Sequence, residues 1–190
     1  KDVMSSMRRN LGLEAGHPSG DKRAQGTAAL MLAVRNSFAD PLSEETLFEW
    51  HRLIMSGHRH LAAGQWRTHI EPMQVVSGAV GHEQVHFEAP PSSRIPDEMA
   101  RFIQWFNDTA PGGKIEIRKA AVRSALAHLY FESIHPFEDG NGRIGRALSE
   151  KVLSQGLGRP ALLSLSRAIE AKRGTYYDAL QEGQQSNEVT

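Results

Sequence analysis

Thirteen residues in the second half of the chain decide its fold: Ile134-His135-Pro136-Phe137-Glu138-Asp139-Gly140-Asn141-Gly142-Arg143-Ile144-Gly145-Arg146. An apolar-periodic segment runs into this stretch and a second one runs out of it. Pro136 disfavours helical geometry at the residue before it, so the incoming helix is expected to stop at about Ile134, with the imidazole of His135 at its end. Residues 139–142 have the composition of a turn, and a new helix is predicted from about Asn141.

The turn also has the composition of an anion-binding site. Gly140 and Gly142 allow successive backbone N–H groups to converge on one point. The unpaired N–H groups and the positive dipole end of the following helix face the same point. Arg143 and Arg146 are three residues apart, so we expect them to share a helix face and to bind phosphate oxygens.

Two further side chains in the stretch supply chemistry. Asp139 offers the hard oxygen ligand that Mg²⁺ uses when it also binds substrate phosphates. His135 titrates near neutrality and is suited to accept a proton from an attacking hydroxyl. Each feature alone has an ordinary structural explanation, because histidines end helices, glycines make turns and arginines face solvent. Their occurrence together within residues 135–146 indicates a site for a nucleotide phosphate.

The stretch resembles the signature of the Fic domain family, His-x-Phe-x-(Asp or Glu)-Gly-Asn-Gly-Arg-x-x-Arg, and every specified position is matched. The resemblance covers about residues 3–184 and is carried further by residues 64–67, 73–78, 85–90 and 176–177. It implies a mainly α Fic fold, with about six or seven helices and one β-hairpin flap beside the active-site loop.

The resemblance also implies an activity. Most members of the family transfer AMP from ATP to a hydroxyl side chain of a target protein, and some also remove it. This chain is therefore expected to be a protein adenylyltransferase that uses Mg²⁺ and modifies Ser, Thr or Tyr of a target protein. The chain itself is one candidate target. Carried over to this sequence, the resemblance implies that His135 is the base, Asp139 the metal ligand and Phe137 a buried anchor of the loop. It also implies that the nucleotide is bound by Gly140, Asn141, Gly142, Arg143 and Arg146.

The adenosine end of the site is assigned less directly. Tyr176 and Tyr177 lie on the last amphipathic helix, and core packing explains them as well as a nucleotide contact does. We take Tyr177 as the candidate that lines the adenosine pocket.

Three other activities stay open at this point. Relatives of the Doc type, which phosphorylate their target, typically carry Lys at the position of Gly142, so Gly142 favours adenylyl transfer over other phosphotransfer. De-AMPylation is a second alternative. The third is an inert Fic interaction module that binds the nucleotide without turnover.

A β-hairpin is predicted on the two sides of Gly78 and Gly81, between a segment rich in valine and the segment 85–87. In Fic proteins such a flap receives an extended stretch of the target by strand addition. The resemblance assigns this edge to Val75, Val76, Ser77 and Gly78. The alternative is an ordinary hairpin that covers an edge of the core.

The same region contains His82-Glu83-Gln84-Val85-His86, which matches the zinc-protease pattern H-E-x-x-H. That pattern works only on a helix, where residues four apart rise ~6 Å. On a strand the two histidines would lie ~13 Å apart, too far to share one Zn²⁺. Because the segment reads as a hairpin, we reject a zinc site.

Regulation is where the sequence departs from the family. Many Fic proteins carry an inhibitory (Ser or Thr)-x-x-x-Glu-(Gly or Asn) helix whose glutamate pairs with the arginine matching Arg146. Glu182-Gly183 is the one Glu-Gly pair, and Asp178 stands where Ser or Thr is needed. We expect the inhibitory helix to be missing from this chain, where it would precede residues 3–13, or inhibition to come from an antitoxin-like partner. Without that glutamate, de-AMPylation is in doubt.

Composition bounds the remaining classes. With 190 residues the chain is expected to be a single Fic domain, 1–190, from a longer protein. Lys and Arg number 22, as do Asp and Glu, so a nucleic-acid or membrane partner is not expected. The absence of Cys fits a reducing compartment, and a cytoplasmic location is expected.

Apolar periodicity predicts the other helices. One is expected over residues 28–38, one capped by Ser43, and one opened by Pro96 with a core stripe of Met99, Phe102, Ile103 and Phe106. In the helix before the motif, the core stripe is predicted to be Val122, Ala125, Leu126 and Leu129.

Overall fold

The computed structural model describes residues 22–56, 62–70, 73–77, 84–161 and 165–185, and over these it is mainly helical. Helices and strands follow in the order α2 (Lys22–Asn36), α3 (Glu44–Met55), β1 (Gln74–Ser77), β2 (Gln84–Glu88), the 3₁₀ turn η1 (Ser92–Arg94), α4 (Ile95–Asp108), α5 (Ala120–Ile134), α6 (Asn141–Leu157), α7 (Leu165–Ala171) and α8 (Arg173–Gln185). These confirm the predicted class. The helix expected within 3–13 lies outside the described residues.

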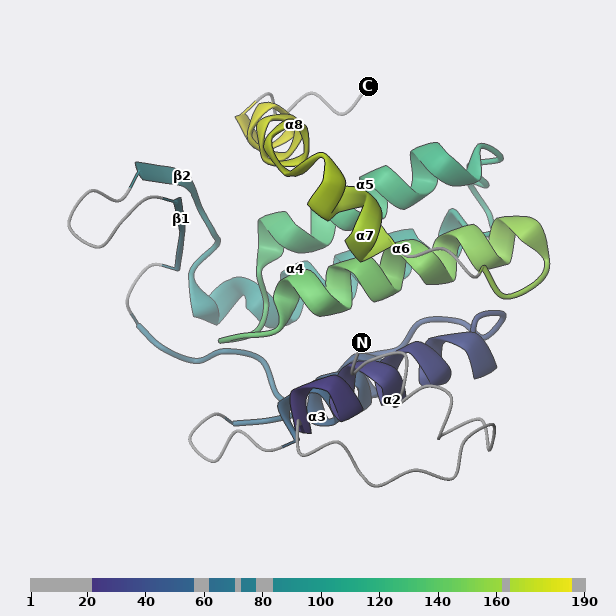
Figure 1. Cartoon of the computed structure of the whole chain (residues 1–190), viewed down its shortest axis with the longest axis horizontal. Helices are drawn as coiled ribbons and strands as arrows, with labels where there is room; N and C mark the ends of the chain where they lie inside the picture. Colours follow the sequence, from purple (N-terminus) through teal and green to yellow (C-terminus); the bar gives the residue numbers. More distant parts are fainter. Residues whose placement is uncertain (1–21, 57–61, 71–72, 78–83, 162–164, 186–190) are drawn as a thin grey trace.

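Helices α5 and α6 form the centre of the molecule. They run antiparallel, joined by the motif loop, and pack along most of their length (Figure 1). Helices α2 and α3 pack on each other and against α6, α4 packs on α5, and α8 lies across α5. The motif therefore lies at one end of the central helix pair.

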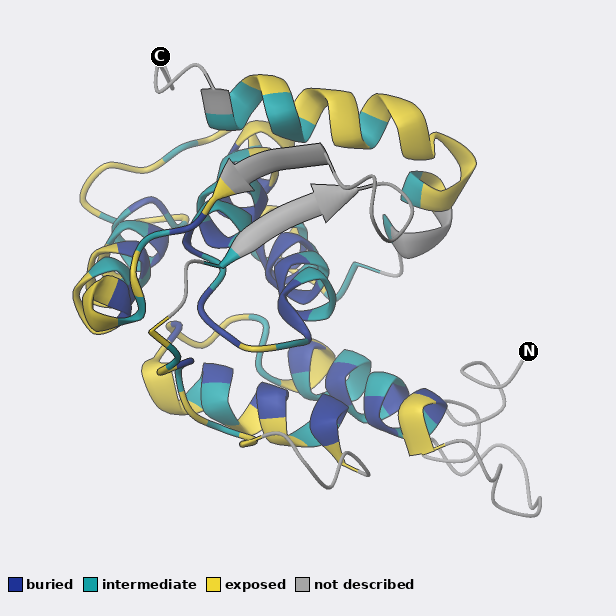
Figure 2. Cartoon of the chain, turned by 90° about the vertical axis from the view of Figure 1, so that its left-hand side faces the viewer, coloured by how far each residue is buried: buried dark blue, intermediate teal, exposed yellow. Residues whose placement is uncertain are grey.

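One continuous apolar core joins these helices, and buried residues mark their inward faces in Figure 2. The predicted stripe of α4 is confirmed, because Met99, Phe102 and Phe106 are fully buried and Ile103 packs at the edge of the core. Pro96 lies in the first turn of α4 as expected. Ser43 caps α3, where its Oγ accepts the N–H of Thr46 at 3.1 Å.

The predicted core face of α5 is wrong. Val122 is 47% exposed and Ala125 is also exposed, whereas the buried face carries Arg123, Ser124, Ala127, His128, Phe131 and Ile134. The polar members of this face have internal partners, which offsets the cost of their burial. Arg123, for example, donates to the main-chain oxygen of Phe106 at 2.6 Å and to Thr109 Oγ1 at 3.0 Å.

Strands β1 and β2 form an antiparallel hairpin, the only sheet in the described residues. Gln74 pairs with Glu88 and Ser77 with Gln84, with an irregularity between Val75 and Val76. Residues 84–86, the last three of the H-E-x-x-H match, are extended rather than helical, and residues 82 and 83 lie outside the described residues. Strand β2 lies against α8. Because the sheet has two strands, β1 pairs with β2 along one edge, and its other edge has no strand partner among the described residues.

None of the helices that the structure describes combines the length and the apolar character that crossing a membrane requires.

Candidate active site

The motif loop has the boundaries that its sequence predicts. Helix α5 ends at Ile134, and His135 caps it in the left-handed conformation, with φ 50° and ψ 59°. It is the only non-glycine residue with positive φ in the described part of the chain. Helix α6 begins at Asn141, capped by Gly140 at φ 88°. The left-handed turn at His135 moves the chain off the helix axis and sets the imidazole beside the loop.

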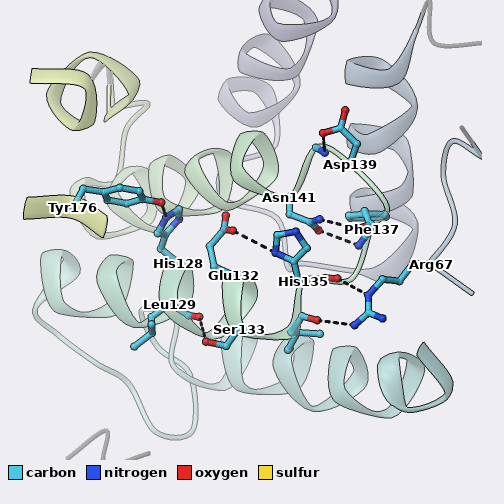
Figure 3. Close-up of polar contacts among 12 residues, drawn as sticks. Arg67, His128, Leu129, Glu132, Ser133, His135, Phe137, Asp139, Asn141 and Tyr176 are labelled. Carbon is cyan, nitrogen blue, oxygen red and sulfur yellow. Dashed lines mark hydrogen bonds and ion pairs between the residues drawn. The ribbon is translucent and has the colours of Figure 1, made fainter. Parts of the chain in front are cut away.

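Arg67 holds this turn from outside the motif. Its guanidinium Nε donates to the main-chain oxygen of His135 at 2.8 Å, and Nη2 reaches the oxygen of Ile134 at 3.4 Å (Figure 3). Its own N–H donates to the oxygen of Pro136 at 2.9 Å. These oxygens lie at the end of α5, where no helical N–H can reach them. Arg67, only 2% exposed, therefore caps the helix that carries His135.

Phe137 and Asn141 lock the loop from within. The side chain of Asn141 accepts the N–H of Phe137 at 3.0 Å and donates to its oxygen at 2.8 Å (Figure 3). The ring of Phe137 is fully buried, as expected for an anchor, and stacks on His51 with ring centroids 4.1 Å apart. Because the amide of Asn141 is engaged in this way and the residue is only 2% exposed, its side chain serves to hold the loop, and its contact with a nucleotide stays a prediction.

His51 ties α3 to the loop. Its Nδ1 accepts the N–H of Gly64 at 2.9 Å, so Nε2 carries the hydrogen and donates to the main-chain oxygen of Asp139 at 3.1 Å. Both nitrogens are thus used within the protein, and burial lowers the pKa of this imidazole. His51 is a packed residue that positions the loop.

The His135 imidazole has a buried and an open side. Nδ1 is buried and lies 3.8 Å from a carboxylate oxygen of Glu132, while the side chain as a whole is 21% exposed. The exposure therefore lies away from Nδ1, on the side of Nε2. Burial lowers the pKa of His135, so the ring is neutral at neutral pH and able to accept a proton.

The N-terminus of α6 follows this loop and has the features that suit an anion. The first N–H groups of a helix have no helical partner, and they carry the positive end of its dipole. Gly140 has the positive φ that this approach needs, and a Cβ there would come within 2.7 Å of Ile54. At Gly142 a Cβ would lie 3.2 Å from the guanidinium of Arg146. The two glycines therefore keep the loop open around the backbone donors.

Arg143 and Arg146 have different partners within the protein, and their predicted contacts with phosphate stay a prediction. Arg143 donates to the main-chain oxygen of Ile54 at 3.1 Å and to Asp139 Oδ2 at 3.2 Å, and it is 13% exposed. Arg146 lies on the α5 side, where its charge acts on Glu132. Arg143 thus joins α3 to the loop, and Arg146 is the less constrained cation beside the α6 N-terminus.

Asp139 is the residue of the loop that fits a metal ion. Its side chain is 46% exposed, with Oδ1 accepting the N–H of Gly140 and Oδ2 paired with Arg143. The described residues contain no group of three or more His, Asp or Glu that could hold a metal on their own. A single open carboxylate suits Mg²⁺ that takes its other ligands from phosphate oxygens and water.

The two tyrosines of α8 have different surroundings. Tyr176 is partly buried, and its hydroxyl is hydrogen-bonded to His128 Nε2 at 2.7 Å (Figure 3). Tyr177, the predicted adenosine contact, is 51% exposed, with the guanidinium of Arg173 5.7 Å from its ring. Tyr176 is therefore the one that faces the helix carrying His135, and the assignment of Tyr177 stays a prediction.

The base of the hairpin is tied to the motif loop at several points. Arg67, which caps α5, also donates to the oxygen of Pro90 and to Ser92 Oγ, just after β2. His69, before β1, lies 3.4 Å from the carboxylate of Glu138 in the loop. The hairpin is thus held beside His135. Of the residues predicted for the flap, Val75, Val76 and Ser77 form β1, and Gly78 lies outside the described residues.

Sequence reasoning missed three residues of this site. Arg67 and His51 are separated from the motif by more than 60 and 80 positions, and no periodic pattern links them to it. Glu132 carries a local signal, because it lies in the last turn of α5, three residues before His135. That signal was available from spacing alone.

Solved structures resemble this chain over most of its length. A Fic domain containing signaling protein from Bacteroides thetaiotaomicron is 23% identical, with a TM-score of 0.68 over 93% of this chain and 63% of that one, a likeness that concerns the fold. A Fic family protein from Desulfovibrio desulfuricans is 28% identical, with a TM-score of 0.66 over 94% of this chain and 50% of that one.

Curated relatives match by sequence. A probable protein adenylyltransferase of Aquifex aeolicus is 34% identical over 46% of this chain and 26% of its own length. The protein adenylyltransferase Fic of Nematostella vectensis is 28% identical over 76% of this chain and 29% of its own length. The chain therefore spans less than a third of the length of these two relatives.

A family model described as Fic/DOC family matches residues 41–153, more than half of the chain. The match contains Arg67, the hairpin, the complete motif, helix α5 and most of helix α6. This chain belongs to the Fic/DOC family.

Proposed function

We propose that this domain is a protein adenylyltransferase, which transfers AMP from ATP to a Ser, Thr or Tyr hydroxyl of a target protein. The observation that carries the proposal is the placement of His135, neutral and open at Nε2, beside the N-terminus of α6. A base next to an anion site is the arrangement that phosphoryl-type transfer needs. The relatives named protein adenylyltransferase favour the same reaction.

In the proposed reaction the target hydroxyl gives its proton to Nε2 of His135 as its oxygen bonds to the α-phosphorus of ATP. The bond between that phosphorus and the oxygen bridging to the β-phosphate breaks, and pyrophosphate leaves with the electron pair. The backbone N–H groups at the start of α6 and the guanidinium of Arg146 offset the negative charge on the phosphates. Arg143 contributes by holding Asp139.

Mg²⁺ is proposed as the cofactor, with Asp139 as its protein ligand. When bound, the ion would neutralise phosphate charge and help pyrophosphate to leave. The chain's own residues set the position of that carboxylate, because His51 holds the main chain of Asp139 and Arg143 holds its side chain.

The target is proposed to dock on β1. This strand has an edge without a strand partner among the described residues, and its hairpin is anchored to the motif loop through Arg67. An extended segment that pairs with Val75, Val76 and Ser77 through main-chain hydrogen bonds would bring its hydroxyl toward His135 with little sequence preference. Inhibition by a helix in cis or by a partner protein, and a cytoplasmic location, stay predictions.

The test uses ATP labelled at the α- or at the γ-phosphate, with Mg²⁺ and a cell lysate. We expect covalent protein label from α-labelled ATP alone. Label from γ-labelled ATP alone would mean that the nucleotide lies reversed and that the domain is a kinase. ATP binding without label from either would indicate an inert module.

A further inference from the structure

A row of titratable side chains runs along one face of α5, away from the motif. His128, Glu132 and His135 are spaced by four and three residues, so they share this face, and Tyr176 of α8 closes its far end (Figure 3). The proposed reaction uses only His135. His128 and Tyr176 are hydrogen-bonded to each other, but Glu132 is poorly explained as packing, because a carboxylate is costly to bury without a partner.

Glu132 is the central member of this row. Its side chain is 12% exposed, and Oε1 is buried without a hydrogen-bond partner among the described residues. Oε2 lies 3.8 Å from His135 Nδ1, another buried atom that lacks a hydrogen bond in the described structure (Figure 3). Oε2 thus faces an unsatisfied ring nitrogen, and a small side-chain rotation would bring the two atoms into hydrogen-bond range.

Helix α6 leaves room for this carboxylate. A Cβ at Gly145 would lie 2.5 Å from Glu132 Oε1 and 3.0 Å from His128 Nδ1. Any larger residue at position 145 would therefore displace the carboxylate. The missing Cβ at position 145 thus leaves the space that the Glu132 carboxylate fills between α5 and α6.

We propose that Glu132 is the positioning residue of His135: its carboxylate accepts the Nδ1–H of the imidazole, which leaves the Nε2 lone pair free toward the target hydroxyl. This inference rests on the proposed adenylyl transfer, where His135 is the base. When Nε2 takes the proton, the carboxylate also stabilises the resulting imidazolium. No proton needs to pass to Glu132 itself.

The charge state of Glu132 decides whether this works. Burial raises its pKa to about 7, and the positive charge of Arg146 on α6 opposes that rise. If Glu132 were protonated, its O–H would donate to Nδ1 and force the hydrogen onto Nε2, which blocks the base. Arg146 thus supports the base indirectly, because it favours the ionised carboxylate.

Several other groups face the pair. On the Glu132 side these are His128 of α5 and Tyr176 of α8. Burial raises the pKa of Tyr176 above its usual value, and the charge of Glu132 raises it further. On the His135 side they are the main-chain oxygen of Glu132, which raises the pKa of the imidazole, Arg67, which lowers it, and Asp139, which raises it. Glu132 is the carboxylate whose oxygen lies within 4 Å of the ring in the described residues.

The test compares wild type with Glu132→Gln, which keeps the size and can still accept Nδ1–H but carries no charge. Histidine ¹⁵N shifts of the chain without ATP report the tautomer and the pKa of His135. We expect the Nδ1–H tautomer in wild type, and a pKa of His135 lower by about one pH unit or more in Glu132→Gln. Glu132→Met accepts no hydrogen bond of this strength, so in this variant the pKa of His135 should also be lower than in wild type, and His135 should lose the preference for the Nδ1–H tautomer.

Kinetics give the second readout. With α-labelled ATP, kcat of Glu132→Gln should fall about tenfold to a hundredfold, with KM for ATP nearly unchanged and the acid limb of the pH profile moved to lower pH. Glu150→Gln is the matched control, because Glu150 is a partly buried carboxylate of α6 that also faces Arg146. It should leave the His135 shifts and kcat as in wild type.

The outcomes separate the two proposals. An unchanged tautomer and pKa of His135 in both Glu132 variants would overturn the positioning role, whatever the activity. The expected ¹⁵N changes in a wild-type chain that transfers no AMP would support the positioning of His135 and refute adenylyl transfer. A rise in KM with unchanged kcat would also contradict the proposal.

Discussion

Arg67 and His135 are 68 residues apart in the sequence, yet the guanidinium Nε of Arg67 donates to the main-chain oxygen of His135 at 2.8 Å. A left-handed conformation costs a non-glycine residue about 1–2 kcal/mol. The hydrogen bond, together with those to Ile134 and Pro136, offsets that cost and joins the hairpin to the motif loop. The orientation of the proposed base therefore depends on a residue outside the motif.

Replacing Arg67 should consequently affect both stability and activity. In Arg67→Met the buried oxygens at the end of α5 lose their donor, and we expect the free energy of unfolding to fall by about 2–4 kcal/mol. Urea denaturation measures this change. Arg94→Met is the control, because the exposed side chain of Arg94 forms an ion pair with Glu98 four residues further along, so its loss should cost less than about 0.5 kcal/mol. Equal costs would contradict the capping role.

Asp139→Asn tests the metal site. The amide keeps the size of the side chain but is a much weaker Mg²⁺ ligand. Loss of a residue that only orients a metal ligand costs about tenfold in affinity, so the Mg²⁺ concentration for half-maximal transfer should rise by more than about tenfold. EDTA should abolish transfer by the wild-type chain. An unchanged Mg²⁺ dependence would show that Asp139 does not bind the ion.

Glu150 should make stability depend on pH. Burial raises its pKa in the folded chain to about 7, above the value of an unfolded Glu, so its contribution is fully present below about pH 4.3 and is lost as pH rises toward 7. With allowance for solvent screening, Glu150→Gln should be more stable than wild type by about 1 kcal/mol at pH 8, and should show no gain at pH 4.5. Urea denaturation at the two pH values measures the difference, and an equal effect at both would contradict it.

Gly145→Ala tests how tightly Glu132 is held. Alanine favours a helix by about 1 kcal/mol over glycine, but its Cβ would collide with Glu132 Oε1. We expect overpacking to outweigh the gain, with a net loss of about 1–2 kcal/mol and slower transfer. Gly174→Ala in α8 is the control, because a Cβ there meets no atom within 4 Å. A more stable and fully active Gly145→Ala chain would mean that Glu132 moves without consequence.

The motif and its helices could be predicted because their signals are local. Pro136 ends α5, Gly140 starts α6, and Ser43 caps α3 through contacts within a few residues. The buried face of α5 could not be predicted, because a search for apolar periodicity assumes that the buried side chains are apolar. Arg123 is buried by virtue of its bonds to the end of α4, which no local pattern reveals.

The site shows the same division. Phe137 was predicted to anchor the loop and does so, but its stacking partner His51 comes from another helix. The spacing of Arg143 and Arg146 could not show that Arg143 would bond to α3 or that the charge of Arg146 would act on Glu132 of α5. Contacts between distant segments are set by packing, which spacing does not encode.

The most direct test of the central claim is the transfer rate from α-labelled ATP to protein in wild type and in His135→Ala, measured with ATP affinity on the same samples. We expect the rate to fall by about a hundredfold or more, as for loss of a general base, while ATP binds with similar affinity. Transfer by His135→Ala at the wild-type rate would contradict the account, because His135 would then not be the base.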